Sequence, residues 1–277
     1  MSGLTGKVAI ITGAGRGQGR AHAVRLAADG ADIVAVDVCA DAVHSVSYGL
    51  ASPADLDETA RLVRETGRRV RTAHADVRDA EAMRKVTADA LAEFGRLDIV
   101  VANAGILSVS PSAELTGEQW QEMIDVNLTG VWNTVQPAIK PMIEAGSGGA
   151  IIMTSSTAGE KGLPGLPHYT AAKHGVIGLM KSLAIELGPH RIRVNAVLPA
   201  AADTPMVHNA ATYKLFRPDL DTPTRSDFEE AIVTGNLLPI PLVAPEDIAA
   251  AVAHLAGDDA RTVTGHAYRV DAGALTQ

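Results

Sequence analysis

Cysteine is almost absent from this chain, in which Cys39 is the single one in 277 residues. One cysteine excludes an intrachain disulfide and is typical of a reducing compartment, so we expect a cytoplasmic protein. No apolar stretch approaches the roughly 20 residues that a membrane-spanning helix needs, and the N-terminus carries no signal-like apolar region. The sequence therefore predicts no membrane insertion.

Positive charge and metal-ligand patterns are also scarce. The net charge is −8 and there is no basic run, whereas nucleic-acid binding needs a positively charged surface. None of the nine histidines stands at ligand spacing from cysteine or another histidine, so we expect no metal. We interpret His168 as a pocket-wall residue and His174 as a helix-surface residue.

No linker, low-complexity run or fixed-period repeat interrupts the chain, and 47% of its residues are hydrophobic. Such a chain can bury one large core, so we expect residues 1–277 to form a single domain. Strand and helix patterns alternate from Lys7 to Asp271, which predicts a Rossmann-type α/β fold with a doubly wound, parallel, seven-stranded sheet. The irregular segment 200–245 follows the sixth strand and is predicted to be a substrate loop with short helices.

A glycine-rich turn at residues 13–19 lies between a short apolar strand, Lys7 to Thr12, and an apolar-periodic helix. Glycines let the backbone approach a pyrophosphate, and the helix N-terminus offers unpaired N–H groups and the positive end of its dipole. Asp37 closes a second strand roughly twenty residues later, where an acid binds ribose hydroxyls and repels a 2′-phosphate. This favours NAD over NADP. One alternative is that Asp37 only caps the end of its strand. Another is that Arg16, a cation in the glycine turn, accommodates the 2′-phosphate of NADP.

Tyr169 and Lys173 are four residues apart in a helical pattern, which puts the phenol and the ammonium on one face. A phenol has a pKa of about 10, and a cation beside it favours the phenolate. The pair can therefore transfer protons near neutral pH. Taken alone, the same spacing also fits a surface helix pair.

Polar residues at two further positions support a site. Ser156 follows the strand-like segment 149–153, which places its hydroxyl at the carboxyl end of a parallel strand, where ligands bind in such sheets. Asn127 lies within an amphipathic helix whose start is marked by Thr116 and Gln119 as a capping box.

Together these motifs resemble the short-chain dehydrogenase/reductase family over residues 6–273. The family's catalytic tetrad falls on Asn127, Ser156, Tyr169 and Lys173. The resemblance implies that Tyr169 is the acid/base, that Ser156 hydrogen-bonds the substrate oxygen, and that Lys173 binds the nicotinamide ribose and lowers the Tyr169 pKa. It implies that Asn127 holds a water linking Lys173 to solvent.

The same resemblance implies a set of cofactor-binding residues. These are Gly13, Arg16, Gly17, Gln18, Gly19, Asp37, Asp76, Val77, Asn103, Ala104, Gly105, Tyr169, Lys173, Pro199, Ala202 and Thr204. The family commonly has Pro-Gly after its sixth strand, and here Ala200 follows Pro199. We therefore expect the loop that meets the nicotinamide to take a slightly different path.

Residues 38–56 form a connection that is longer than a normal strand-to-helix loop. This insertion, with segments 162–166 and 213–220, resembles the mycofactocin-coupled subfamily that includes carveol dehydrogenase-like enzymes. The resemblance implies that the insertion covers the adenosine half of NAD and retains it over many turnovers, with a mycofactocin-type redox carrier as a partner. A variable surface loop is the alternative.

The predicted function is reversible hydride transfer between NAD and a hydrophobic secondary alcohol or ketone. The expected pocket residues are Leu107, Leu163, Leu166, Met206, Tyr213 and Phe216. One alternative is an NADP-linked carbonyl reductase, against which Asp37 weighs. Another is a non-catalytic NAD-binding sensor on the same fold, against which the intact tetrad weighs. We also expect a homotetramer that packs through residues 178–184.

Overall fold

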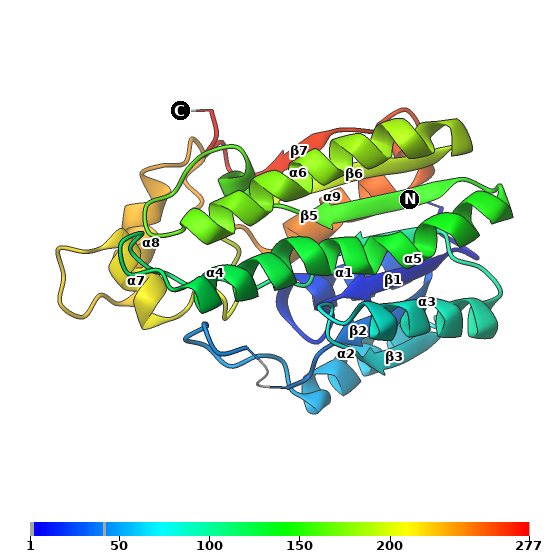
Figure 1. Ribbon diagram of the computed structural model, residues 1–277, viewed down its shortest axis with the longest axis horizontal. Helices are drawn as coiled ribbons and strands as arrows, with labels where there is room; N and C mark the ends of the chain where they lie inside the picture. Colours follow the sequence, from blue (N-terminus) through cyan, green and yellow to red (C-terminus); the bar gives the residue numbers. More distant parts are fainter. Residues whose placement is uncertain (1–2, 41–42, 277) are drawn as a thin grey trace.

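The protein is described here by a computed structural model covering residues 3–40 and 43–276. Over these residues, seven strands form one parallel sheet in the order β3-β2-β1-β4-β5-β6-β7 (Figure 1). The strands are β1 Val8–Thr12, β2 Asp32–Asp37, β3 Val70–His74, β4 Ile99–Ala102, β5 Gly149–Thr154, β6 Ile192–Pro199 and β7 Ala267–Val270. The predicted fold class is confirmed. Asp41 and Ala42, within the predicted insertion, lie outside the described residues.

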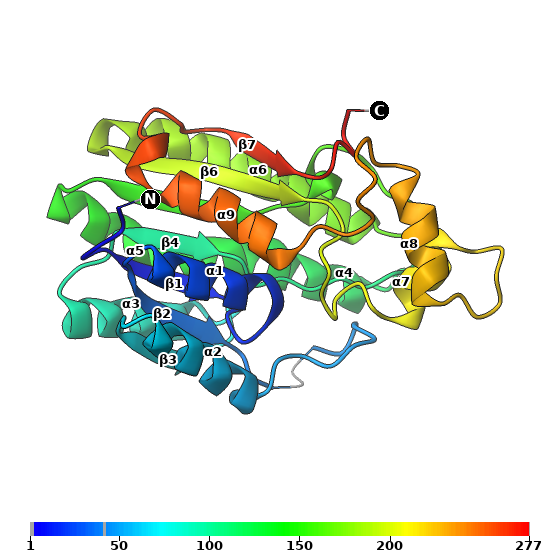
Figure 2. The ribbon, with the colours of Figure 1, turned by 180° about the vertical axis from the view of Figure 1, so that it is seen from behind.

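Helices cover both faces of the sheet (Figure 2). They are α1 Gly17–Ala28, α2 Pro53–Glu65, α3 Ala80–Phe94, α4 Gly117–Ile124, α5 Gly130–Ala145, α6 Pro167–Leu187, α7 Ala210–Phe216, α8 Arg225–Val233 and α9 Pro245–Ala256. Residues of α3, α5 and α6 share one apolar cluster with the sheet, and residues of α1, α2 and α9 share another. None of the described helices is long and apolar enough to cross a membrane.

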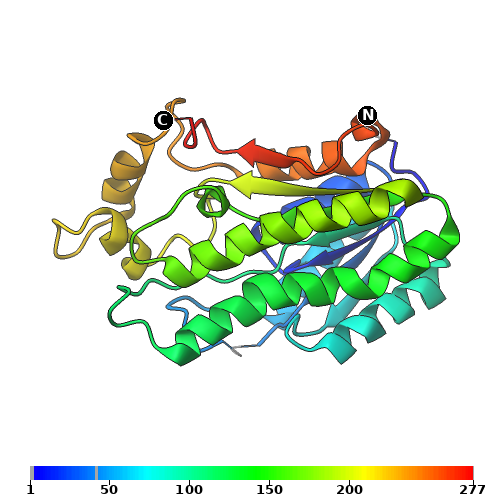
Figure 3. The same ribbon diagram turned by 45° about the horizontal axis from the view of Figure 1, so that its top comes forward.

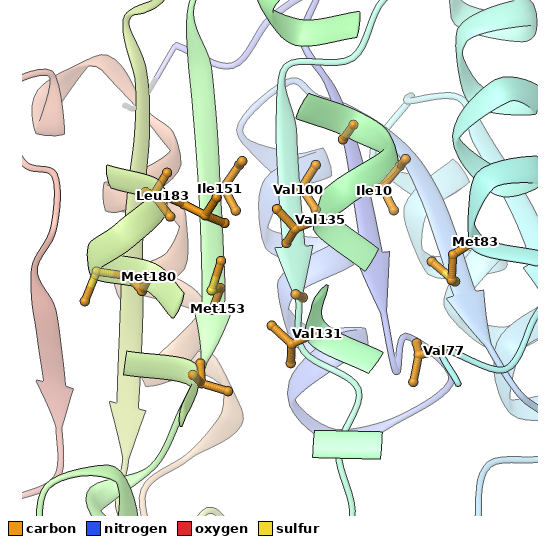
Figure 4. Packing of buried hydrophobic residues seen from close by; sticks show 14 of the residues in the cluster. Ile10, Val77, Met83, Val100, Val131, Val135, Ile151, Met153, Met180 and Leu183 are labelled. Carbon is orange, nitrogen blue, oxygen red and sulfur yellow. The ribbon is translucent and has the colours of Figure 1, made fainter. Parts of the chain in front are cut away.

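The central strands are apolar except at their carboxyl ends, because both of their faces are covered. All residues of β1 and β4 are buried. Figure 4 shows the packing on one face, where Val135 of α5 lies beside Val100, and Leu183 of α6 lies beside Ile151. This core fixes the positions of the strand ends, from which the polar side chains of the site project.

The site is positioned by the point at which the strand order reverses. β1 pairs with β2 on one side and with β4 on the other, so the loops after β1 and β4 diverge and leave a crevice at their carboxyl ends. Helices α7 and α8 extend beyond this end of the sheet (Figures 1 and 3). They belong to the segment 200–245, which contains short helices as predicted.

Candidate active site

A cleft follows the carboxyl ends of the strands and contains every residue of the predicted site. Its cofactor-side cavity is lined by Gly13, Arg16, Gly17, Gln18, Gly19, Asp37, Asp76, Val77, Asn103, Ala104, Gly105 and Thr204, among others. Its substrate-side cavity is lined by Asn127, Ser156, Tyr169, Lys173, Pro199 and Ala202, among others. The two cavities share Gln18, Asn103, Gly105, Ile106, Thr204 and Met206, so they form one elongated cleft.

The glycine turn is packed so closely that side chains would not fit. A Cβ at Gly19 would lie 2.0 Å from the carbonyl oxygen of Gly13. The amide of Asn103, at the end of β4, donates to the carbonyl of Thr12 at 3.0 Å, and the Thr12 hydroxyl accepts from the Asn103 N–H at 3.1 Å. These bonds hold the ends of β1 and β4 together beneath the cleft.

Asp37 lies at the end of β2 with its carboxylate against the glycine turn. It accepts hydrogen bonds from the N–H of Gly15 at 2.8 Å and of Cys39 at 3.3 Å. A Cβ at Gly15 would lie 2.9 Å from the Asp37 Oδ2, so glycine is what permits this approach. The guanidinium of Arg16 donates to the carbonyl of Gly49. Arg16 is thus directed at the insertion, while Asp37 presents negative charge where the ribose is expected.

The far wall of the cofactor-side cavity contains Asp76 and Val77. Both carboxylate oxygens of Asp76 accept hydrogen bonds from Arg78. Burial raises the Asp76 pKa, but the Arg78 bonds outweigh it and leave the pKa below its ordinary value. The carboxylate is therefore charged at neutral pH.

The residues predicted to be catalytic meet at the base of the substrate-side cavity. The Nζ of Lys173 donates to the carbonyl of Thr154 at 2.8 Å and lies 5.5 Å from the centre of the Tyr169 ring. Burial lowers the pKa of Lys173 to about 8. Burial raises the pKa of Tyr169, and a hydrogen bond with the Ser156 hydroxyl opposes this rise. The predicted lowering of the Tyr169 pKa by Lys173 stays a prediction.

The two neighbouring serines have different partners. Ser155 is buried, and its hydroxyl donates to the carbonyl of Lys173 at 2.9 Å. Ser156 is less buried, and its hydroxyl accepts from the N–H of Ala158 at 3.1 Å and interacts with Tyr169. Ser155 therefore supports the strand end, while Ser156 can reach a substrate oxygen.

Asn127 lies within a helical segment as predicted, but in a π-helical turn, Asp125–Thr129, that directly joins α4 to α5. Such turns are rare and often occur at functional sites. The fully buried side chain accepts from the N–H of Ile106 at 3.1 Å and donates to its carbonyl at 3.0 Å. Asn127 thereby fixes the loop after β4. These contacts do not test the prediction that Asn127 holds a water that links Lys173 to solvent.

The segment after β6 lies at the end of the cleft where the nicotinamide is expected. Ala202 pairs with Val243 in a short parallel bridge formed by the backbone groups of its neighbours Ala201 and Asp203. The N–H and carbonyl of Ala202 therefore point away from Val243. A Cβ at Gly17 would lie 3.1 Å from the Thr204 methyl, so Thr204 lies against the glycine turn.

The substrate-side cavity measures about 280 Å³ and is lined mainly by apolar residues. The predicted residues that line it are Leu107, Leu163, Leu166, Met206 and Phe216. The prediction for Tyr213 was wrong, because Tyr213 does not line this cavity: its ring stacks on Phe228 at 5.2 Å, and its hydroxyl lies 3.0 Å from the His208 Nδ1.

The interpretation of His168 as a pocket-wall residue was also wrong. Its ring is fully buried outside the cavity lining, with Nε2 2.9 Å from the Ser108 hydroxyl. Burial lowers its pKa, which keeps the ring neutral. His174 lies on the exposed face of α6 as predicted.

Several residues of the cleft were missed from the sequence. Tyr48 lines the cofactor-side cavity, and Glu122 binds the insertion from α4. Asp203 pairs with His208 at 2.6 Å and with Arg225 at 3.1 Å beside the substrate-side cavity. The length of the insertion was a signal for Tyr48, but no local motif marks the other residues.

The cleft fits an extended dinucleotide. It offers a glycine cradle at the helix N-terminus, a carboxylate for the ribose, and a buried Gln18 Oε1 that has no hydrogen-bond partner among the described residues. Within the same described residues, no group of His, Cys, Asp or Glu could hold a metal ion.

Comparison with known proteins agrees with this geometry. The family model for short chain dehydrogenases matches residues 7–214. The (-)-trans-carveol dehydrogenase of Rhodococcus erythropolis is 50% identical over 274 residues, covering 99% of each chain.

Solved structures agree as well. Carveol dehydrogenase from Mycobacterium avium, in complex with NAD, is 49% identical with a TM-score of 0.97, covering all of both chains. A short chain dehydrogenase from Mycobacterium paratuberculosis, bound to NAD, is 44% identical with a TM-score of 0.91, covering 99% of this chain and 100% of that one.

The chain belongs to the short-chain dehydrogenase/reductase family. It is an NAD-linked oxidoreductase that acts on alcohols and ketones, as predicted.

Proposed function

We propose that this enzyme oxidises a compact, hydrophobic, cyclic secondary alcohol of terpenoid type to its ketone, reversibly. The observation that carries this proposal is the meeting of Ser156, Tyr169 and Lys173 at the base of an apolar cavity that continues into the cofactor-side cavity. At about 280 Å³ the cavity lies near the lower end of small-molecule sites, which run from roughly 300 to 1,000 Å³. The similarity to the carveol dehydrogenases supports a substrate of this class.

The chain's own residues move the proton and orient the alcohol. Tyr169 takes the hydroxyl proton as its phenolate, which the Lys173 ammonium 5.5 Å from the ring centre favours, and becomes the neutral phenol beside Ser156. Ser156 donates a hydrogen bond to the substrate oxygen and holds it in place. Lys173, fixed by the Thr154 carbonyl, presents its ammonium to the nicotinamide ribose and to Tyr169. Bound NAD would supply the acceptor for the hydride that leaves the carbinol carbon.

NAD is held by the residues that were predicted to bind it. The glycine turn binds the pyrophosphate, Asp37 the adenosine ribose, Asp76 and Val77 the adenine side, and Thr204 with the Ala202 backbone the nicotinamide end. Contacts from Gly15 and Cys39 hold Asp37 against the cleft, and this supports NAD over NADP.

The insertion covers the adenosine half of NAD and retains it over many turnovers. Its residues Val38, Val43, Tyr48 and Leu50 line the cofactor-side cavity, which supports this role. A retained NADH must be reoxidised in place, so the enzyme works with a separate redox carrier of the mycofactocin type. The single cysteine supports a cytoplasmic location.

The subunits assemble as a homotetramer through α6. Within residues 178–184, Gly178 and Ser182 are small and exposed, and Ile185 beside them is 80% exposed, whereas Met180, Leu183 and Ala184 are buried in the subunit's own core. Light scattering at micromolar concentration should give the mass of four chains. A monomer would contradict this assembly, and a dimer would still allow the α6 interface.

A substrate screen tests the proposed function. Freshly purified protein is given cyclic and terpenoid secondary alcohols with an artificial electron acceptor and, separately, with free NAD alone. We expect turnover with compact cyclic alcohols that is brisk with the acceptor and feeble with NAD alone. Absence of turnover on every alcohol, with NAD bound, would favour the non-catalytic sensor. Preference for added NADP would favour the carbonyl reductase.

A further inference from the structure

Residues 43–50 of the insertion, called the strap below, cross the cofactor-side cavity at its open side. Val43, Tyr48 and Leu50 line the cavity. In Figures 1 and 2 the connection between β2 and α2 runs outside the helical layers toward the end of α4. The strap has no helix or strand of its own, so its position depends on what it binds.

Two of its bonds go to the carboxylate of Glu122 in α4. One carboxylate oxygen accepts the N–H of His44 at 3.1 Å, and the other accepts the N–H of Ser45 at 2.9 Å. Burial raises the Glu122 pKa, but the bonds from Ser45 and His44 outweigh it and keep the pKa below its ordinary value. The carboxylate is thus charged at neutral pH, and its hydrogen bonds are roughly twice as strong as neutral ones.

Glu122 also connects the strap to the adenine wall of the cavity. The Nη1 of Arg78 lies 3.5 Å from the Glu122 Oε1, and the same guanidinium binds both carboxylate oxygens of Asp76. The Glu122 side chain is only 14% exposed, so water screens these charges weakly. The strap, Glu122, Arg78 and Asp76 therefore form one charged network around the adenine side.

Two further bonds fix the other end of the strap. The Tyr48 hydroxyl accepts a hydrogen bond from the N–H of Leu107 at 2.9 Å, in the loop after β4, and the carbonyl of Gly49 accepts one from the guanidinium of Arg16. Asn127 holds the adjacent Ile106 of that loop. This end of the strap is thus attached to the body of the protein as well.

The strap meets the substrate side through a much weaker contact. Residues 207–233, called the lid below, include α7 and α8. The Ser47 hydroxyl donates to the Asn209 amide oxygen at 3.2 Å in an exposed, neutral bond, and Asn209 caps α7. Such a bond contributes little, so the lid can part from the strap while the strap stays on the body.

We propose that Glu122 is a positioning residue that holds the strap closed over the adenosine half of NAD, independently of the lid. The inference rests on the proposed binding of NAD in this cleft. It explains how alcohol and ketone can exchange under the lid while the cofactor remains.

The rate of NADH release tests this proposal. Each protein is loaded with NADH and mixed with excess NAD, and the loss of bound NADH fluorescence is followed. Glu122→Ala should release NADH roughly 10- to 100-fold faster than wild type, since hydrogen bonds to a charged group are lost. Glu122→Gln should fall between the two, because its amide oxygen keeps one acceptor.

Matched controls separate the effect of the Glu122 hydrogen bonds to the strap from general effects of charge. Glu118→Gln removes a carboxylate from the exposed face of the same helix, and Ser47→Ala removes only the contact with the lid. Both should release NADH within about twofold of wild type. Amide hydrogen exchange at His44 and Ser45 should accelerate in Glu122→Ala, at an unchanged melting temperature.

Release from Glu122→Ala at the wild-type rate, in a folded protein, would overturn the proposal. Release from Ser47→Ala as fast as from Glu122→Ala would also overturn it, since strap and lid would then move together. Rapid NADH release by wild type would contradict the retention of NAD in the proposed function. The ratio of the release rates of Glu122→Ala and wild type would still test whether Glu122 holds the strap. Failure of all variants and wild type to bind NADH would instead contradict the proposed function.

Discussion

The two ends of the cleft are held by different kinds of contact. At the cofactor end, Asp37, Asn103 and Glu122 bind backbone groups through hydrogen bonds that are buried at Asp37, part-buried at Asn103 and at Ser45, and exposed at His44. At the substrate end, the lid is held by side-chain pairs such as Arg225 with Asp203, which are 53% and 43% exposed. Exposed pairs contribute only about 0–1 kcal/mol each.

This difference matches two different tasks. The cofactor end is built to stay in one arrangement, because loss of one backbone contact leaves a partly buried charge without its partner. The lid can open at small cost, because water replaces its exposed ion pairs. An enzyme that keeps its cofactor and exchanges its substrate needs this combination.

The largest expected effect lies where the two ends meet. Tyr169→Phe should lower turnover by at least about 100-fold, because the proton acceptor is lost while the ring remains. NAD should stay bound, as measured by mass spectrometry of the denatured protein. Tyr268→Phe on β7, away from the cleft, should behave as wild type. Near-normal turnover of Tyr169→Phe with the same alcohol would contradict the assignment.

A buried histidine behind the glycine turn gives the cofactor end a pH dependence. Burial lowers the pKa of His22 in α1 to about 4 from 6.5, against a smaller opposing effect of Asn103. The unfolded chain therefore takes up this proton first as the pH falls from 6.5 to 4, and the folded state loses stability over that window.

His22→Leu should remove this loss. Between pH 7 and pH 4, the free energy of unfolding should decrease by about 3 kcal/mol less in the variant than in wild type. Urea unfolding of both proteins at each pH measures the difference. Parallel pH profiles would show that His22 does not limit acid stability.

Asp37 tests the recognition of the ribose at the cofactor end. In Asp37→Ala, NAD affinity should fall and NADP affinity should rise relative to it, with their ratio changing by roughly 10-fold or more. Titration of both cofactors measures the ratio, and Asp57→Ala on the exposed face of α2 is the control. An unchanged ratio of the NAD and NADP affinities would mean that Asp37 does not recognise the ribose.

The smallest effect is expected at the lid. Arg225→Gln breaks the ion pair with Asp203 and should change the KM for the alcohol by no more than about fivefold. NADH release should keep its wild-type rate, in contrast to Glu122→Ala. Faster NADH release from Arg225→Gln would remove the distinction between the two ends.

Local patterns in the sequence were enough to predict the strands, the glycine turn and the residues at the strand ends. Asp37 and Ser156 follow apolar strands, so their place in a parallel sheet follows from chain order. The capping box at Thr116 and Gln119 was also found as predicted. Such features depend on neighbours along the chain.

The remaining features depend on contacts between distant segments. Glu122 meets His44 across 78 positions, and nothing near Glu122 in the sequence indicates this partner. Tyr213 has the composition of a pocket residue, but its hydroxyl pairs with His208 and turns the ring onto Phe228. The π-helical turn at Asn127 adds a residue to a turn whose apolar pattern looks continuous.

The most direct test of the account measures the cofactor on freshly purified protein. Wild type and a variant with residues 39–50 replaced by a short Gly/Ser connector are denatured, and released NAD(H) is quantified by mass spectrometry. Ser52, which caps α2, is kept in the variant. We expect close to one NAD(H) per wild-type chain and little in the variant. Cofactor-free wild type that turns over briskly on added NAD would contradict retention by the insertion.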